Sequence, residues 1–231
     1  MYSCTNGYFQ IFDIGAMRRL PIAKQGSPYI IGLAVLLLVF GLLDWTILTV
    51  LTFIVTLLVI NFFRDPERTI PQDPQAVLAP ADGRIIFAGK VFEDRFLNKE
   101  TLKISIFMSI FNVHVNRIPF SGEVESLHYE KGTFFAAHVD KASRDNEHNA
   151  VILNISGGEK IVFIQIAGLV ARRIDCWIKP GERVQRGDRF GMIRFGSRLD
   201  VFVPTDSRLA VNKGQRVKAG ESILCHHLKD K

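Results

Sequence analysis

Several features that place chains in other protein classes are scarce in this sequence of 231 residues. The three cysteines form no CxxC pair and show no metal-ligand spacing with histidine, so neither a structural disulfide nor a metal site is expected. His226 and His227 stand too close to each other and to the C-terminus to indicate a metal. Basic residues form no run suited to a nucleic-acid groove, although the net charge is +6, so no nucleic-acid partner is expected.

Charge is almost missing from one long stretch of the chain. Residues 29–63 contain a single charged side chain, Asp44. One continuous helix of this length would span about 52 Å, which exceeds the roughly 30 Å of a bilayer core. The pair Asp44-Trp45 therefore predicts the tip of a helical hairpin, with apolar segments at 27–43 and 45–63.

Positive charges flank this apolar stretch on both sides, at Arg18, Arg19 and Lys24 before it and at Arg64 and Arg68 after it. Cytoplasmic flanks of membrane segments are enriched in lysine and arginine. The expected location is therefore the cell membrane, with the rest of the chain on the cytoplasmic face. The sequence leaves open whether the hairpin spans the bilayer or only dips into it, and a buried pair of core helices is the alternative.

The chain after the hairpin is expected to form a mainly β domain. Four of the nine prolines lie within residues 64–80, which indicates an extended linker. Short β-branched and aromatic runs then predict strands at 84–91, 102–109, 122–129, 150–155 and 160–166. The expected organisation is an N-terminal cytoplasmic segment, a membrane hairpin, a proline-rich linker and a β domain, at residues 1–26, 27–63, 64–80 and 81–231.

The C-terminal third contains an internal repeat. Residues 180–190 and 213–223 share the pattern x-G-x-R-V-x-x-G-x-x-apolar at an offset of 33 residues. Glycines at these places suit tight turns with positive φ, and the valine suits a buried strand position. Two copies are too few for a solenoid. They favour a β-sandwich or flattened barrel with a lipoyl-like repeat, so the expected fold class is mainly β (α+β), with the helical hairpin in front.

Three short motifs carry candidate chemistry: PADG at 80–83, HVNRIP at 114–119 and FGSRLD at 195–200. Each motif is weak by itself, since a Gly-Ser dipeptide usually marks a turn. Taken together, in this order and behind an apolar hairpin, they resemble the phosphatidylserine decarboxylases in their shorter form. The resemblance runs from about residue 64 to the C-terminus.

This resemblance implies a chain that cuts itself between Gly196 and Ser197 and converts Ser197 into a pyruvoyl group, the covalent cofactor. The large chain 1–196 and the small chain 197–231 would stay together as a heterodimer, and a higher oligomer stays open. The pyruvoyl group would form a Schiff base with the amine of phosphatidylserine. Phosphatidylethanolamine and CO2 would be the products, and the lipid bilayer would be the second partner.

The residue types at the cleavage site suit this chemistry. Attack of a serine hydroxyl on the preceding carbonyl closes a strained five-membered ring, and Gly196 tolerates unusual backbone angles because it has no Cβ. The serine oxygen can act first as nucleophile and then as leaving group. Ser197 lies between the two copies of the repeat, where rigid β-structure would hold it.

The resemblance also gives roles to Asp82, His114 and Arg117. Asp82 would position or deprotonate the Ser197 hydroxyl through a neighbouring base; a turn aspartate that only caps an N–H group is the alternative, and one aspartate can do both. His114 would perform acid–base chemistry near the pyruvoyl group. Larger relatives have a second histidine where this chain has Arg117, so an Asp–His–Ser relay through that histidine is unavailable. Arg117 could bind a substrate carboxylate or phosphate, or form a structural ion pair.

The segment at residues 134–149, which includes His138 and His148, is polar and loop-like. Four of its residues belong to the resemblance: Asp140, Lys141, Asn146 and Glu147. No mechanism follows for them from their types and spacing. A turn with solvated charges is therefore the default expectation for this segment.

Two other functions remain as alternatives. A non-catalytic, membrane-anchored adaptor could use the lipoyl-like domain, but a carrier would need a modifiable lysine, and residues 191–211 contain none. A lipid-directed serine hydrolase would need a G-x-S-x-G elbow, which the chain lacks around Ser197. The expected function is therefore that of a self-processing, pyruvoyl-dependent decarboxylase, a carboxy-lyase.

Overall fold

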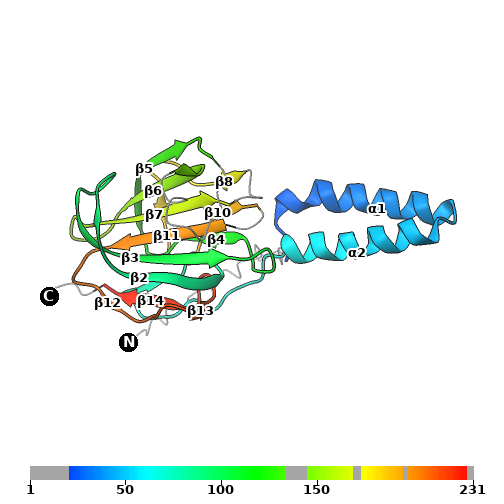
Figure 1. Ribbon diagram of the computed structural model, residues 1–231. Coiled ribbons are helices and arrows are strands. Elements are labelled where there is room, and N and C mark those ends of the chain that lie inside the picture. Colours follow the sequence, from blue (N-terminus) through cyan, green and yellow to red (C-terminus); the bar gives the residue numbers. More distant parts are fainter. Residues whose placement is uncertain (1–20, 134–144, 169–172, 195–196, 228–231) are drawn as a thin grey trace, which may run out of the picture.

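The structure, a computed structural model, describes residues 21–133, 145–168, 173–194 and 197–227. Two helices form a hairpin that projects from a β domain (Figure 1). The domain combines one large sheet with two small ones. The expected class, a mainly β fold behind an N-terminal apolar hairpin, is thereby confirmed.

The hairpin consists of α1 (Ser27–Leu42) and α2 (Thr46–Phe62), preceded by the single turn η1 (Lys24–Gly26). Pro28 stands in the first turn of α1, where its missing N–H costs no helical hydrogen bond. Asp44 lies at the predicted tip and adopts a φ of 55°. This is the left-handed conformation that short polar residues tolerate, and it ends the first helix.

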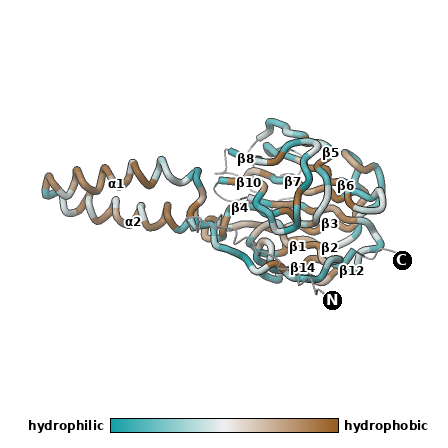
Figure 2. Tube along the Cα trace, turned by 180° about the vertical axis from the view of Figure 1, so that it is seen from behind, coloured by the Kyte–Doolittle hydropathy of each residue, from teal (hydrophilic) through white to brown (hydrophobic). Residues whose placement is uncertain are grey.

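Both helices present apolar side chains to their surroundings over most of their length (Figure 2). The stretch Lys24–Leu42 is long and apolar enough to cross a membrane, whereas α2 is a shorter apolar helix. Because these side chains are exposed, the hairpin is not a pair of core helices of the β domain. An exposed apolar surface of this kind indicates association with a membrane.

The root of the hairpin packs against the β domain. An apolar cluster joins Ala23, Phe62 and Phe63 to Val113, Val115 and Met192. The carbonyl oxygen of Phe63 also accepts the N–H of Ala23 at 2.8 Å, which closes the two ends of the hairpin onto each other. The hairpin is therefore attached to the domain through buried contacts as well as through the chain itself.

The large sheet is antiparallel, with the strand order β13-β2-β3-β11-β7-β6-β5-β9. Its strands are β2 (Gly83–Glu93), β3 (Lys99–Met108), β5 (Gly122–Glu130), β6 (His148–Asn154), β7 (Lys160–Ala167), β9 (Arg183–Val184), β11 (Ser197–Val203) and β13 (Arg216–Val217). The five predicted strands correspond to β2, β3, β5, β6 and β7, with bounds that differ by no more than three residues. The sheet curls into a half-barrel around the main apolar core (Figure 1).

Two three-stranded sheets complete the domain. The first consists of β1 (Ala76–Leu78), β14 (Ile223–His226) and β12 (Arg208–Leu209), in that order. The second consists of β4 (Val115–Arg117), β10 (Arg189–Ile193) and β8 (Ile174–Cys176), in that order. Both contribute buried side chains, such as Val77 and Phe190, to the main core. One core therefore unites all three sheets.

Side chains alternate between two faces along β11. Leu199, Val201 and Val203 belong to the main core, whereas Phe202 belongs to a separate cluster on the opposite face. By this alternation the side chain of Ser197 lies on the same face as Leu199. The first residue of β11 therefore directs its hydroxyl toward the interior of the half-barrel.

The two copies of the predicted repeat have the same backbone geometry. Gly181 and Gly187 have φ values of 82° and 86°, and their counterparts Gly214 and Gly220 have values of 92° and 74°. These angles lie in the left-handed region that glycine adopts without steric cost. The short strands β9 and β13, one from each copy, form the two edges of the large sheet.

A second pair of related segments, APADG at 79–83 and IPFSG at 118–122, packs against these copies. The first residue of each segment accepts the N–H of the second glycine of one copy, at 2.8 Å in both cases. A Cβ on Gly83 would come within 2.2 Å of a carbonyl oxygen of the neighbouring strand, and one on Gly122 within 2.3 Å. Close backbone packing therefore explains the glycine of the PADG motif without any catalytic role.

Candidate active site

Ser197 opens β11 at the end of the sheet that faces the hairpin (Figure 1). It pairs with Met108, the last residue of β3, and with Ala167, the last residue of β7. Its side chain is fully buried, and its hydroxyl donates to the sulfur of Met108 at 3.3 Å. A thioether is a weak acceptor, so the hydroxyl is held without a strong partner. Gly196, on the other side of the predicted scissile bond, lies outside the described residues.

His114 lies directly ahead of β4 and is fully buried. Its Nδ1 stands 2.9 Å from the carbonyl oxygen of Asn112, so Nδ1 carries the proton and donates it to this acceptor. Nε2 is buried and has no hydrogen-bond partner within the described part of the chain. Burial lowers the pKa of the imidazole from 6.5 to about 4. His114 is therefore neutral near pH 7 and keeps a free lone pair on Nε2, as a general base requires.

The root of the hairpin supplies part of this burial. The ring centre of Phe62, at the end of α2, lies 4.2 Å from that of the His114 imidazole. Phe62 is itself buried and belongs to the apolar cluster at the hairpin root. The hairpin thus shields the candidate base from water and connects the apolar helices to the site.

Asn116 connects the HVNRIP motif to Ser197. Its side chain is fully buried, and its Nδ2 lies 3.8 Å from the sulfur of Met108. The same sulfur accepts the Ser197 hydroxyl, so the two motifs meet at one side chain. The side-chain oxygen of Asn116 accepts a hydrogen bond of 2.9 Å from Gln165. The sequence pattern did not single out these partners, although Gln165 within the apolar run KIVFIQIA was an available signal.

Asp82 holds neighbouring segments together. Nη2 of Arg68 lies 2.9 Å from both of its carboxylate oxygens, and the N–H of Ala219 donates to one of them at 2.8 Å. In the other half of the domain, Ser121 takes the equivalent place and accepts the N–H of Arg186 at 3.0 Å. The cap that the turn pattern suggests is therefore present in both halves.

The separation of Asp82 from Ser197 is large for direct proton transfer. Arg84 pairs with Phe107 on β3, and Ser197 pairs with Met108, the next residue along that strand. Two strand spacings of about 4.8 Å, roughly 10 Å in all, therefore separate the two segments. A relay from Asp82 to the Ser197 hydroxyl would need a group between them.

Arg117 is committed to the linker. Its buried guanidinium donates to the carbonyl oxygens of Gly187 at 2.8 Å and of Pro66 at 3.0 Å. Asp65 lies 3.6 Å away and completes an ion pair. Burial lowers the pKa of Arg117 below its ordinary value, and the positive charge of Arg189 adds to this effect. These contacts favour the structural ion pair over a substrate contact.

The segment ahead of β6 differs from the expectation. Asn146, Glu147 and His148 are buried, so the predicted turn with solvated charges is wrong for them. Asn146 donates to the carbonyl oxygen of Ala167 at 2.7 Å, and His148 begins β6. Strand pairing and hydrogen bonding satisfy these buried polar groups. They also bring the segment next to Ala167, the strand neighbour of Ser197. Three other residues of the predicted turn lie outside the described residues: His138, Asp140 and Lys141.

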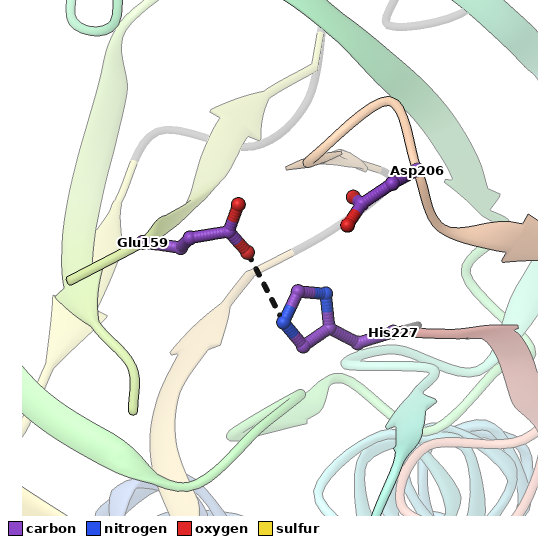
Figure 3. A group of neighbouring side chains, drawn as sticks. All are labelled: Glu159, Asp206 and His227. Carbon is purple, nitrogen blue, oxygen red and sulfur yellow. Dashed lines mark ion pairs between the residues drawn. The ribbon is translucent and has the colours of Figure 1, made fainter. Parts of the chain in front are cut away.

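A second polar cluster lies at the other end of the sheet (Figure 3). Glu159 precedes β7, Asp206 follows β11 and His227 follows β14. One potential ligand atom from each lies within 4.8 Å of the others, close enough to share a metal ion. Nε2 of His227 pairs with Glu159 at 3.1 Å, so an ion pair already occupies one side of the ring. The sequence pattern did not reveal this group because its members come from three distant segments.

A buried serine hydroxyl and a neutral imidazole with a free lone pair are the parts of an enzyme site with a nucleophilic side chain. Here they stand at one end of a β domain that bears an apolar hairpin. Residues 55–225 match the family described as phosphatidylserine decarboxylase, and the chain belongs to this family of carboxy-lyases.

Curated relatives include proteins named phosphatidylserine decarboxylase proenzyme. The protein of Desulfotalea psychrophila is 46% identical over 89% of this chain and 96% of the relative. The protein of Syntrophus aciditrophicus is 49% identical over 88% of this chain and 96% of the relative. The protein of Geotalea uraniireducens is 45% identical over 90% of this chain and 97% of the relative. Identity over nearly the full length of both chains confirms the resemblance drawn from three short motifs.

Proposed function

We propose that this protein is a self-processing decarboxylase that converts phosphatidylserine to phosphatidylethanolamine and CO2 at a membrane surface. The observation that carries the proposal is the meeting of the Ser197 hydroxyl and the HVNRIP motif at the Met108 sulfur. The names of the relatives, which include both the lipid and the word proenzyme, support it. Ser197 is the proposed nucleophile and, after cleavage, the source of a pyruvoyl group.

Self-cleavage begins when the Ser197 hydroxyl oxygen adds to the carbonyl carbon of Gly196 and passes its proton to a base. His114 suits this task because its Nε2 has no hydrogen-bond partner among the residues that the structure describes. The bond from that carbon to the nitrogen of residue 197 breaks, the nitrogen takes up the proton, and an ester forms. Loss of the Cα proton then expels the carboxylate of Gly196 and leaves a dehydroalanine. Water hydrolyses this group, which releases ammonia and leaves the pyruvoyl end.

The surroundings of Ser197 fit such a group. The position is buried at the end of an interior strand, and the uncharged side chains of Met108 and Asn116 lie beside it. When present, the pyruvoyl group withdraws the electrons that remain on the substrate as CO2 departs. His114 can take a proton on Nε2 and later return one to the substrate carbon. Asp82 contributes by holding the linker through Arg68.

The two chains that cleavage would leave are joined by many strand pairs. β11 lies between β3 and β7 and pairs with both along most of its length. β13 and β14, which also follow the cleavage site, pair with β2 and β1. A heterodimer of chains 1–196 and 197–231 would therefore stay associated without a disulfide.

The site end of the domain is proposed to rest on the cytoplasmic face of a membrane. The hairpin leaves the domain from the end at which β11 begins (Figure 1). Ile110 and Phe111, in the loop after β3, are 49% and 65% exposed, and Arg64 at the hairpin root donates to the carbonyl oxygen of Phe111. Exposed apolar side chains at this place suit insertion among lipid head groups. A two-chain lipid leaves the bilayer slowly, so a site at the surface meets its substrate there.

Intact mass and a denaturing gel of the protein purified in detergent test the proposal. We expect chains 1–196 and 197–231, with the smaller one lacking a free terminal amine and reacting with a hydrazide. The protein should release CO2 from vesicles that contain phosphatidylserine, but not from vesicles of phosphatidylcholine alone. A single uncleaved and inactive chain, in detergent and in lipid, would contradict the proposal and favour a membrane adaptor.

A further inference from the structure

Three buried amides form a line through the core toward Ser197. Asn149 on β6 donates to the side-chain oxygen of Gln165 on β7 at 3.0 Å. Gln165 donates through Nε2 to the side-chain oxygen of Asn116 at 2.9 Å. Nδ2 of Asn116 lies 3.8 Å from the Met108 sulfur, which also accepts the Ser197 hydroxyl. Each of the three amide residues is at most 3% exposed.

Packing does not account for these amides. Val151, Phe163 and Leu199, from the same face of the large sheet, are apolar and fully buried. Burying an amide in such surroundings is unfavourable unless its polar atoms are paired. An apolar side chain of similar volume would fill each position without this cost. A line of amides that ends at the thioether contacted by the candidate nucleophile therefore indicates a use in the reaction.

Gly191 makes room for this line. A Cβ at Gly191 would come within 2.8 Å of Gln165 Nε2 and within 2.4 Å of the carbonyl oxygen of Asp175. Gly191 is also the strand partner of Asn116. The bare backbone of β10 therefore packs directly over the Gln165 amide and keeps it against Asn116.

The order of donors and acceptors gives the line a direction. The side-chain oxygens of Gln165 and Asn116 each accept a hydrogen bond from the amide before them, so their nitrogens point onward to the next group. Nδ2 of Asn116 carries two N–H groups, and it ends the line at a thioether, a weak acceptor. Such a donor forms a much stronger hydrogen bond when a negatively charged oxygen develops nearby. Because this hydrogen bond is stronger in the transition state than in the ground state, it lowers the activation barrier.

We propose that Asn116 is a catalytic donor for the reaction at residue 197, and that Gln165 and Asn149 are positioning residues that act through it. The donor stabilises the oxygen that becomes negative when the Ser197 hydroxyl adds to the preceding carbonyl carbon. In that step a bond forms from Oγ to the carbon, the carbonyl π electrons move onto its oxygen, and the hydroxyl proton passes to His114. This inference rests on the proposed self-cleavage.

The rate of self-cleavage of the full chain tests the role of Asn116. The chain is made in a cell-free system with lipid vesicles, and cleavage is followed on a denaturing gel. Asn116→Asp keeps the shape and the acceptor for Gln165 but removes the donor. We expect cleavage to slow by about a hundredfold, a usual cost of losing one donor to a developing oxyanion. Hydroxylamine, which cleaves esters, should release little small chain, because the ester itself forms slowly.

Thr101→Val is the matched control for this variant. Thr101 is fully buried on β3 and donates through its hydroxyl to the carbonyl oxygen of Val91, away from the line of amides. Its replacement also removes one buried polar group from the large sheet. The control should cleave at the wild-type rate.

A double variant tests whether Gln165 acts through Asn116. Gln165→Met alone should slow cleavage by about tenfold, because the Asn116 amide then loses the donor that orients it. Adding Gln165→Met to Asn116→Asp should slow cleavage no further. A purely structural role would instead add its own effect and lower the melting temperature.

The outcomes separate this inference from the function on which it rests. Wild-type rates in both Asn116→Asp and Gln165→Met, while the wild-type chain cleaves, would overturn the inference and leave self-processing intact. A wild-type chain that does not cleave would overturn the proposed function. If Asn116→Asp does not fold, Gln165→Met decides alone: a tenfold loss at an unchanged melting temperature supports the inference, and a wild-type rate overturns it.

Discussion

The two ends of the large sheet carry polar groups of different character. At the end facing the hairpin, Ser197 and Asn116 contact a thioether, and Nε2 of His114 has no partner within the described residues. At the other end, Nε2 of His227 forms an ion pair with Glu159 at 3.1 Å, whereas its Nδ1 has no partner within the described residues. A histidine occurs at both ends, so the residue type does not separate them. Buried polar atoms without a partner occur at both ends, and the hairpin end differs because its imidazole is paired with no carboxylate within the described residues. A neutral imidazole can accept a proton, which favours the hairpin end as the proposed reactive one.

The hairpin accounts for part of this contrast. Phe62 packs on His114 and excludes water from the imidazole. At the opposite end, Asp206 is exposed beside His227. A free base and a weakly held hydroxyl are therefore preserved where the apolar helices cover the sheet, and charged groups gather where water reaches it.

Removal of the Ser197 hydroxyl should have the largest effect. Ser197→Ala leaves no atom that can attack the preceding carbonyl, so we expect neither cleavage nor CO2 release. A denaturing gel and a CO2 assay with phosphatidylserine vesicles measure both. Ser207→Ala, which removes another buried hydroxyl from the segment after β11, is the control and should cleave normally. Cleavage of the Ser197→Ala chain at this position would refute the assignment.

Replacement of the imidazole should have the next largest effect. His114→Gln keeps a polar side chain of similar size but supplies no base, so cleavage should slow by about 10²–10⁴-fold. In the wild-type chain the pKa of about 4 leaves Nε2 unprotonated at neutral pH. The rate of cleavage should therefore stay level from about pH 8 to pH 5 with respect to this group, and fall toward pH 4 as Nε2 is protonated. A fall that begins near pH 7 would contradict a buried, neutral imidazole.

Opening the hairpin root should make the two ends of the sheet more alike. Phe62→Ala should lower the unfolding free energy by roughly 3 kcal/mol, as removal of a buried phenylalanine usually does. It should also admit water to His114, so the pKa should rise from about 4 toward 6.5. The acid limb of the cleavage rate then moves to higher pH. Phe53→Ala, at an exposed position of the same helix, should leave that limb unchanged.

Asp82 and Ser121 occupy equivalent places in the two halves of the domain. Comparing their variants therefore tests how much the carboxylate of Asp82 contributes to stability. Asp82→Asn removes the charge paired with Arg68, whose side chain is only 7% exposed, and should lower the unfolding free energy by roughly 2 kcal/mol. Ser121→Ala removes one cap and should cost about 1 kcal/mol. Denaturant titration measures both. An Asp82→Asn chain of normal stability that fails to cleave would support a direct relay to Ser197 instead.

The polar cluster at the far end of the sheet should matter least. His227→Gln breaks the ion pair with Glu159, a partly exposed partner, and should cost at most about 1 kcal/mol. Cleavage and CO2 release should stay within about twofold of wild type, and a chelator should change neither. A large loss on chelation would indicate that a metal at this cluster supports the fold or the reaction.

Local pattern was sufficient for the helices and most strands. The apolar run interrupted at Asp44-Trp45 predicts two helices, because a single one would be too long for a bilayer. Strands such as 160–166 stand out because β-branched and aromatic residues lie between turn residues. The repeated segments at 79–83 and 118–122 escaped notice because they share little beyond one proline and one glycine.

For the candidate site, the sequence predicted some residues and missed others. Ser197 and His114 became candidates because their motifs resemble those of a known family, and the structure buries both at the hairpin end of the domain. Asn116 and Gln165 were not singled out: the apolar run KIVFIQIA suggests that Gln165 is buried, but no local pattern shows which distant groups an amide will meet. Asn146 was expected in a solvated turn for the same reason.

By itself, the sequence determined the order of the segments, the apolar hairpin, the glycine turns and the family resemblance that proposes Ser197 as the cleavage site. These features depend on residue type and on spacing along the chain. Only the tertiary structure decided that His114 is neutral with a free Nε2, that Asp82 pairs with Arg68 and that Arg117 holds the linker. Desolvation and pairing depend on groups that the fold brings together from distant positions, and no local pattern contains that information.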